Sequence, residues 1–185
     1  MTHVRTILCL VSCLLSVTGC EKIDLEKEGG GGEPVVAQTL PLRSGEGTQE
    51  SPLMVEQVIE SDTLSARYYW VIGYVVGSTY RTMGNAVFEA TTTYDSNILL
   101  ASDSTCTSVD RCIPVELKST KIRQIASLPS NPGLHRQCIM VQGQYGRYFS
   151  RPGLRETRSA YWLPGFDISS IVTAPIQWNE RDSLF

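Results

Sequence analysis

Between residues 68 and 163 the chain alternates short apolar runs with polar segments that are rich in glycine, serine and threonine. The first run, residues 68–77, is aromatic and β-branched, which predicts a long strand. Gly73 lies inside this run, where a glycine is typical of a bulge or a sharp bend. Four further apolar runs predict strands at 97–101, 112–117, 138–149 and 158–163.

Two short segments have helical spacing of their apolar residues. Ser51 can cap a helix and Pro52 suits its first turn, so we expect a helix from residue 51 to about residue 61. A second expected helix, 119–127, begins at Ser119, which is also a capping residue. The polar segments 78–96, 102–111 and 150–156 are predicted to be loops.

The predicted order is therefore a helix, three strands, a helix and two strands. Five strands with a helix between the third and the fourth are typical of the OB-fold, a small and partly open Greek-key barrel. We accordingly expect a mainly β, five-stranded, OB-fold-like Greek-key barrel over residues 51–166. The apolar residues of 167–185 predict a C-terminal extension that packs on this barrel.

The first fifty residues differ in character from the rest. Arg5 precedes an apolar run, residues 7–17, that is too short to span a bilayer, and small residues then lead to Cys20. This pattern is typical of a secretory signal over residues 1–20. Residues 21–50 contain a run of four glycines and lack apolar periodicity, which predicts a flexible, acidic tether.

The segment Val17-Thr18-Gly19-Cys20 resembles the lipobox of bacterial lipoproteins. The resemblance implies that a diacylglycerol is attached to the Cys20 thiol and that Cys20 becomes the first mature residue. We therefore expect an outer-membrane lipoprotein that is bound to the membrane by its N-terminal lipid. The attached domain would face either the periplasm or the exterior.

Charge is unevenly distributed, although the net charge is only -3. Residues 21–50 hold seven acidic residues against three basic ones, whereas residues 118–158 hold eight basic residues against a single acid, Glu156. The basic stretch favours an anionic partner. The alternative is that its first members, Lys118, Lys121 and Arg123, are only the solvated face of a short helix.

Three cysteines follow Cys20. Cys106 and Cys112 could close a short loop by a disulfide in an oxidising compartment, which the chain-entropy model values at roughly 2 kcal/mol. The alternative is two free thiols. Cys138 lies in an apolar run and is predicted to be a small buried residue. His135 is the only histidine after residue 20 and the cysteine spacing is wrong for zinc, so we expect neither a metal nor a cofactor.

Five segments in sequence order carry a family resemblance. Together they resemble an OB-fold-like domain of unknown function that occurs in lipoproteins and secreted proteins of Bacteroides and its relatives. The resemblance spans about residues 51–165 and implies a fold and a cell-envelope setting, but no activity, catalytic residue or ligand. The segments are 52–55, 70–77, 96–101, 112–117 and 148–154.

An OB-fold binds ligands over its second and third strands, between the loops that join strands 1 and 2 and strands 4 and 5. Here those loops are 78–96 and 150–156, in which aromatic residues stand beside arginines, a combination that suits stacking on a ring and pairing with an anion. The alternative for the aromatic residues is a place in the core of the barrel; it applies to Tyr69, Trp70 and Phe149, and also to Tyr80 and Tyr148. The candidate ligand-binding residues are Tyr80, Arg81, Arg147, Tyr148, Arg151 and Arg155.

The sequence contains no convincing catalytic pattern. We find no nucleophile with an obvious base, no phosphate-binding Gly-Lys-Ser/Thr loop and no calcium-loop pattern, so we do not expect an enzyme. A hydrolase would require His135 or several carboxylates to converge in a pocket. We predict a non-catalytic, lipid-anchored binding module for a glycan or another anionic ligand; nucleic acid does not fit the compartment. The alternative is a structural or assembly subunit that docks onto another envelope protein.

Overall fold

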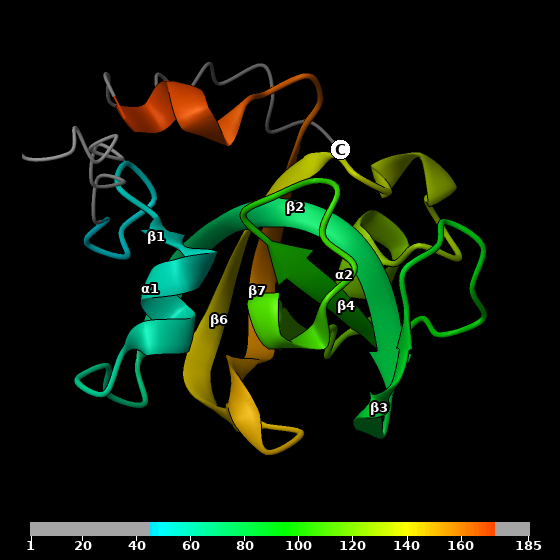
Figure 1. Cartoon of the computed structure of the whole chain (residues 1–185), viewed down its shortest axis with the longest axis horizontal. Coiled ribbons are helices and arrows are strands. Elements are labelled where there is room, and N and C mark those ends of the chain that lie inside the picture. The colour runs from blue at the N-terminus through cyan, green and yellow to red at the C-terminus, as the bar shows by residue number, and fades with distance from the viewer. Residues whose placement is uncertain (1–44, 173–185) are drawn as a thin grey trace, which may run out of the picture. The chain divides into compact units, whose positions relative to one another are not determined.

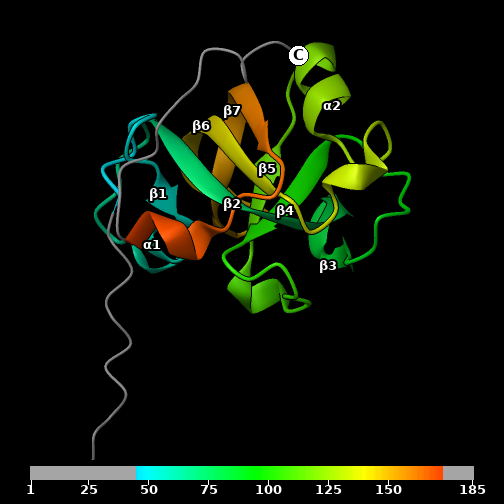
Figure 2. The ribbon, with the colours of Figure 1, turned by 90° about the horizontal axis from the view of Figure 1, so that it is seen from above.

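The computed structural model describes residues 45–172 and is mainly β, with few helices (Figures 1 and 2). The predicted signal, Cys20, most of the tether and residues 173–185 lie outside the described residues. The strands are β1 (Leu53–Met54), β2 (Tyr68–Tyr80), β3 (Thr82–Val87), β4 (Asn97–Ala101), β5 (Ile113–Glu116), β6 (Cys138–Tyr148) and β7 (Arg151–Leu163). The helices are α1 (Val55–Glu60) and α2 (Thr120–Ala126), with 3₁₀ turns η1 (Val109–Arg111), η2 (Pro132–Leu134) and η3 (Ile168–Val172).

The strands form one mixed sheet. Six of them follow the order β1-β2-β4-β5-β7-β6, while β3 pairs with β2 beside this path and β2 also pairs with β6. The pairs β1–β2 and β5–β7 are parallel, and β5–β7 consists of a single residue pair, Val115 with Leu154. This corrects the expected five-stranded, partly open barrel: the structure has a mixed sheet with two additional short strands, β1 and β3, and β5 and β7 pair at one residue only.

Strand β2 pairs with four other strands, β1, β3, β4 and β6, and it arches over the other strands in Figure 1. Its first half, from Tyr68 to Tyr74, pairs with β6, and its second half, from Tyr74 to Ser78, pairs with β4. The change of partner falls beside Gly73, where the sequence predicts a bend. A Cβ atom at Gly73 would lie 2.8 Å from Cγ2 of Val55, so α1 packs closely against this point of the strand.

The interior of the sheet is filled by aliphatic side chains from both helices and from every strand except β3. Val55 and Val58 of α1 and Ile122 and Ala126 of α2 pack into this core because helical spacing puts each pair on one face. A second cluster, on another face of β2, contains Trp70, Ile72, Met140, Cys138 and Ile168. Residues 167–172, the described part of the predicted C-terminal extension, thus pack on the sheet through Ile168.

The first helix begins later than the sequence predicts. Leu53 and Met54 pair in parallel with β2, so the helix begins at Val55. We expected Ser51 to cap this helix. Instead, the side chain of Gln57 reaches back to the start of the helix, where its Oε1 accepts a hydrogen bond from the amide of Met54 at 2.9 Å. Ser51 instead accepts hydrogen bonds at its carbonyl from Glu46 and Gly47.

Strands occupy nine of the nineteen residues of 78–96 and six of the seven residues of 150–156, two segments that we predicted to be loops. In the segment 78–96, Ser78 to Tyr80 prolong β2, and Thr82–Val87 forms β3 as its antiparallel partner. The segment 150–156 belongs to β7, which pairs with β6 from its first residue, Tyr148 opposite Arg151. Backbone pairing creates both strands, although their sequences lack the apolar alternation of a half-buried strand.

Residues 45–50, the described end of the predicted tether, are held against the domain. The amide of Gly45 donates to Oε1 of Gln57 at 2.8 Å, and the amide of Trp70 donates to the carbonyl of Gly47 at 2.9 Å. The described domain therefore includes these residues.

Candidate functional site

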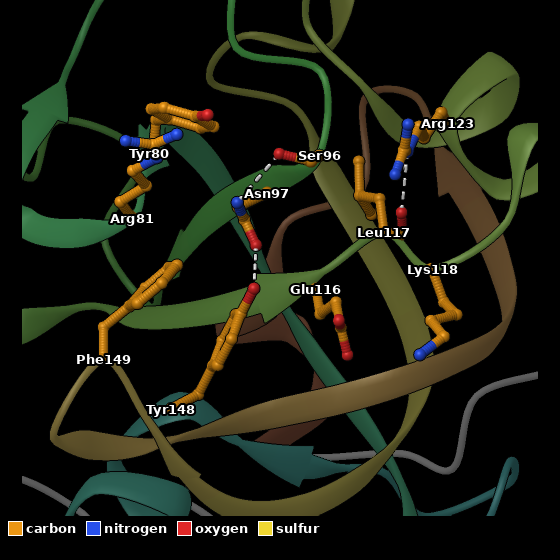
Figure 3. A pocket seen from close by; sticks show the side chains of 10 residues that line it. All are labelled: Tyr80, Arg81, Ser96, Asn97, Glu116, Leu117, Lys118, Arg123, Tyr148 and Phe149. Carbon is orange, nitrogen blue, oxygen red and sulfur yellow. Dashed lines mark hydrogen bonds between the residues drawn. The ribbon is translucent and has the colours of Figure 1, made fainter.

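A pocket of about 420 Å³ opens between two tight turns of the sheet, the β2–β3 turn at Arg81 and the β6–β7 turn at Phe149 and Ser150 (Figure 3). The beginning of β4 and the end of β5 lie between the turns. The residues that line the pocket are Tyr80, Arg81, Ser96, Asn97, Glu116, Leu117, Lys118, Arg123, Tyr148 and Phe149.

A buried amide lies in the middle of the pocket. The side chain of Asn97 is only 3% exposed, and its Nδ2 donates to the carbonyl of Thr79 at 3.2 Å and to Oγ of Ser96 at 3.0 Å. Its Oδ1 accepts a hydrogen bond from the hydroxyl of Tyr148. These contacts fix the orientation of the amide, because both of its hydrogens and one oxygen lone pair are used.

Two stacked aromatic pairs stand at the turns. The rings of Tyr80 and Tyr94 lie 5.6 Å apart, and those of Tyr148 and Phe149 lie 4.1 Å apart. Tyr80 is 40% exposed, and the guanidinium of Arg81 lies 4.9 Å from its ring centroid. Such surfaces offer apolar faces on which a flat ring can stack.

Both turns contain residues in the left-handed backbone region. Arg81 has φ 61°, and Phe149 and Ser150 have φ 50° and 65°. The two-residue turn between Tyr148 and Arg151 thus has the geometry that Asn-Gly normally provides, but with side chains at both positions. Strain of this kind is found most often at functional sites, and here it lies on the rim of the pocket.

Replacing Ser150 with glycine should therefore raise the free energy of unfolding by about 0.5–1 kcal/mol. Glycine removes the steric strain that a side chain causes at positive φ, and this gain exceeds the extra conformational entropy that glycine gives the unfolded chain. Urea denaturation measures the change. Ser104→Gly is the matched control, because Ser104 is a turn serine without positive φ, and it should lower stability slightly. Equal effects of the two substitutions would contradict the claim that the backbone is strained at Ser150.

Lys118 and Arg123 lie on the side of the pocket opposite Arg81 (Figure 3). Nζ of Lys118 is 2.8 Å from Oε1 of Glu156, and Nη1 of Arg123 is 3.8 Å from Oδ2 of Asp95. Glu116 accepts a hydrogen bond at Oε2 from the amide of Glu156 at 2.9 Å. The hydrogen bond and charge of Glu156 raise the pKa of Lys118, and Lys118 lowers that of Glu156. Exposed pairs of this kind stabilise the fold little, so an anionic ligand can replace them.

The structure brings three of the six predicted ligand-binding residues into the pocket: Tyr80, Arg81 and Tyr148. Arg155 lies beside it, with its guanidinium 5.8 Å from the ring centroid of Tyr148 and Nε 4.0 Å from Oε2 of Glu116.

Arg147 and Arg151 do not line the pocket. Arg147 donates from Nη2 to the carbonyl of Ser150 at 2.7 Å. Arg151 pairs with Asp110 and donates to the carbonyl of Val109 at 3.1 Å, which ties β7 to η1. Neighbouring residues of a strand point to opposite faces, so Arg147 and Tyr148 cannot both face the pocket.

The polar residues between the turns were not among the residues predicted to bind a ligand. Asn97 and Glu116 stand at the ends of otherwise apolar strand segments, and a polar residue in such a position is a signal that could have identified them. Lys118 and Arg123 were interpreted as part of a basic stretch or as the solvated face of a short helix. The structure places both on the pocket. Phe149, for which we considered a core position, also lines it.

Burial of the Tyr148 hydroxyl, together with the negative charge of Glu116, raises its pKa to about 12 from the usual 10.0. The folded protein favours the neutral form of the Tyr148 hydroxyl. The contribution of this group to the stability of the fold is therefore complete below pH 10 and is lost as the pH rises from 10 to about 12. Tyr148→Phe should remove a late-titrating tyrosine from the ultraviolet absorbance titration. Tyr80→Phe is the control, and loss of the same late phase in it would contradict the assignment.

Cys106 and Cys112 are both free and buried in the structure, so the second alternative, two thiols, describes it. Their sulfurs donate to the carbonyls of Ser108 and Val109, each at 3.6 Å. Burial raises the pKa of Cys112 to about 12, which keeps this thiol protonated and unreactive. Cys138 is buried in the Trp70 cluster.

Across residues 45–172, no group of three or more His, Cys, Asp and Glu side chains is arranged to hold a metal ion. His135 caps the end of η2 and is partly exposed. None of the described helices is both long and apolar enough to cross a bilayer.

Comparison with known sequences identifies a domain of unknown function, DUF6359, over residues 53–163. The match extends from β1 to the end of β7 and includes every pocket residue. It agrees with the part of the sequence resemblance that concerns a domain of unknown function. No curated protein and no solved structure matched the chain. Because the match covers more than half of the sequence, the chain belongs to the DUF6359 family.

Proposed function

We propose that this protein is a non-catalytic binding module that holds a glycan or another anionic ligand in the pocket between the β2–β3 and β6–β7 turns. The observation that carries the proposal is the composition of that pocket. Aromatic pairs at its two turns flank a fixed amide, Asn97, and cationic side chains lie at both ends. Aromatic faces, a fixed polar group and cations together suit a ligand that has both a ring and a negative charge.

The proposal includes an OB-fold. Strands β2, β4, β5, β7 and β6 pair in a cycle that β2–β6 completes, and α2 lies between β5 and β6, as expected for such a fold. The pocket lies over the beginning of β4 and the end of β5, between the two turns, which corresponds to the usual OB-fold binding face. Fold analogy alone does not name a ligand, so the argument depends on the pocket residues.

The setting is a proposal as well. A lipid on Cys20 would anchor the domain to the outer membrane, on its periplasmic or its exterior side. Glycans are abundant in that compartment, whereas nucleic acid is not its usual polymer. The compartment therefore supports a glycan ligand.

The test is a glycan-array and single-stranded DNA screen with the purified full-length chain, followed by titration of each hit. Tyr80→Ala should weaken binding about tenfold or more, because a stacking face is lost. Trp162→Ala is the matched control, since Trp162 is 41% exposed, as Tyr80 is, but lies outside the pocket. An unchanged affinity in Tyr80→Ala, or the absence of any hit, would contradict the proposal.

A second candidate is a subunit that docks onto another envelope protein. The observation in its favour is the exposed indole of Trp162 on β7. Trp178, in the predicted C-terminal extension, lies outside the described residues. A protein contact that is lost in Trp162→Ala and kept in Tyr80→Ala would support docking.

A further inference from the structure

We propose that the ligand of this pocket is an acidic sugar of the uronic-acid class, a ring that combines hydroxyl groups with one carboxylate. This inference rests on the proposed function and makes it more specific. It depends on the hydrogen-bonding capacity that the pocket residues have left after their contacts with one another.

Glu116 is the first reason. Its side chain is 19% exposed, and Oε2 is already used by the amide of Glu156 at 2.9 Å. Oε1 accepts no hydrogen bond from any residue in the range 45–172. A carboxylate oxygen can only accept, so the ligand group next to it must donate, as a sugar hydroxyl does.

The residues around Asn97 also favour a ligand with hydroxyl groups. The hydroxyl of Tyr148 donates to Asn97, so toward a ligand its oxygen can only accept. The hydroxyl of Ser96 accepts from Asn97 and is therefore free to donate. The middle of the pocket thus offers acceptors at Glu116 and Tyr148 and a donor at Ser96. Neighbouring sugar hydroxyls, each of which both donates and accepts, match this arrangement.

The cations require a negative group. Arg81, Lys118 and Arg123 line the pocket, while Glu116 is the one acidic residue of the lining. Lys118 and Arg123 pair with acids that lie outside the lining, whereas Arg81 has no ion-pair partner within the described residues. Its guanidinium, at the turn beside Tyr80, can bind a carboxylate through two parallel hydrogen bonds.

Glu116 also argues against other anions. A fully ionised phosphate or pyrophosphate has no proton to donate, so it would leave Oε1 of Glu116 without a hydrogen-bond partner. A neutral sugar would satisfy Glu116 but leave Arg81 without an anion. An acidic sugar satisfies both, and its apolar ring face can stack on an aromatic pair.

The experiment is calorimetric titration of the full-length chain with an α-1,4-linked galacturonic-acid trimer, with maltotriose and with inorganic pyrophosphate. The wild type should bind the acidic trimer at least tenfold more tightly than either of the others. Glu116→Gln should weaken binding of the acidic trimer about tenfold without weakening that of pyrophosphate, because the charge-assisted hydrogen bond that is lost is one that only a donating ligand makes. The glutamine carbonyl can still accept from the amide of Glu156, so the fold is kept. Glu60→Gln, at the exposed end of α1, is the matched control.

Arg81→Gln provides a second variant. It should bring the affinity for the acidic trimer close to that for maltotriose while binding of maltotriose itself changes little. If the wild type binds maltotriose or pyrophosphate at least as tightly as the acidic trimer, and Tyr80→Ala weakens that binding, the acidic-sugar inference is overturned and the proposed function stands. If none of the three probes binds, the inference is overturned as well, and a blank glycan array would then overturn the proposed function.

Discussion

Replacing Gly153 with alanine is expected to lower the free energy of unfolding by about 2–3 kcal/mol. A Cβ atom at this position would lie 2.5 Å from the carbonyl oxygen of Pro114, which belongs to the backbone and cannot rotate away. The two strands would have to separate next to Val115 and Leu154, the single residue pair that joins β5 to β7. Urea denaturation, followed by tryptophan fluorescence, measures the loss.

Gly146 provides the matched control for this substitution. It is the direct partner of Gly153 in the β6–β7 ladder, and a Cβ atom there would have no neighbour within 4 Å. Gly146→Ala should therefore leave stability unchanged or raise it by up to about 1 kcal/mol, as expected for alanine in an open strand position. A similar loss in both variants would show that the β5–β7 junction is not the cause.

Asn97→Leu is expected to lower the free energy of unfolding by about 3 kcal/mol and to abolish ligand binding. Leucine has nearly the same shape, but it leaves the carbonyl of Thr79 without its donor and the hydroxyl of Tyr148 without its acceptor. Buried polar groups that lose their partners retain their full desolvation cost. Thermal or urea denaturation gives the stability, and titration with a screened glycan gives the binding.

A double-mutant cycle with Tyr148→Phe separates the hydrogen bond from packing. In the Tyr148→Phe background, Asn97→Leu should lower the free energy of unfolding by less, because the Tyr148 hydroxyl that would lose its acceptor has already been removed. The pair should therefore show a coupling of about 1 kcal/mol. Strictly additive losses would mean that the contact between these two side chains does not stabilise the fold.

Much of the sheet could be predicted because its interior strands carry their own apolar signal. The segments 97–101 and 138–149 coincide closely with β4 and β6, and the Ser119 cap of α2 is confirmed by its hydrogen bond with the amide of Ile122 at 3.2 Å. Strands β1 and β3 could not be predicted in the same way. Both pair with β2, but β1 has only two residues, Leu53 and Met54, and β3 is mostly polar, so neither carries an apolar alternation long enough to be recognised in the sequence.

The site was predictable only where its signal is local. Aromatic residues next to arginines led to Tyr80, Arg81 and Tyr148, all of which line the pocket. The same signal also included Arg151, whose guanidinium is bound to η1, because a linear pattern does not reveal a partner distant in sequence. Glu116 carries a local signal as a polar residue at the end of an apolar strand, but only the structure shows that its Oε2 accepts from the amide of Glu156, forty residues away.

The arrangement of strand partners also determines the order in which the chain can fold. Strands β6 and β7 are joined by a two-residue turn, so their ladder can grow outward from that turn with almost no loop to close. Tyr68 of β2, in contrast, pairs with Gln144, about 75 residues farther along the chain. Contacts that are distant in sequence slow folding, so we expect refolding on the millisecond-to-second scale, with an early β6–β7 hairpin. Strand β2, which pairs with more strands than any other, is therefore the one whose pairing is completed last, when β6 joins it.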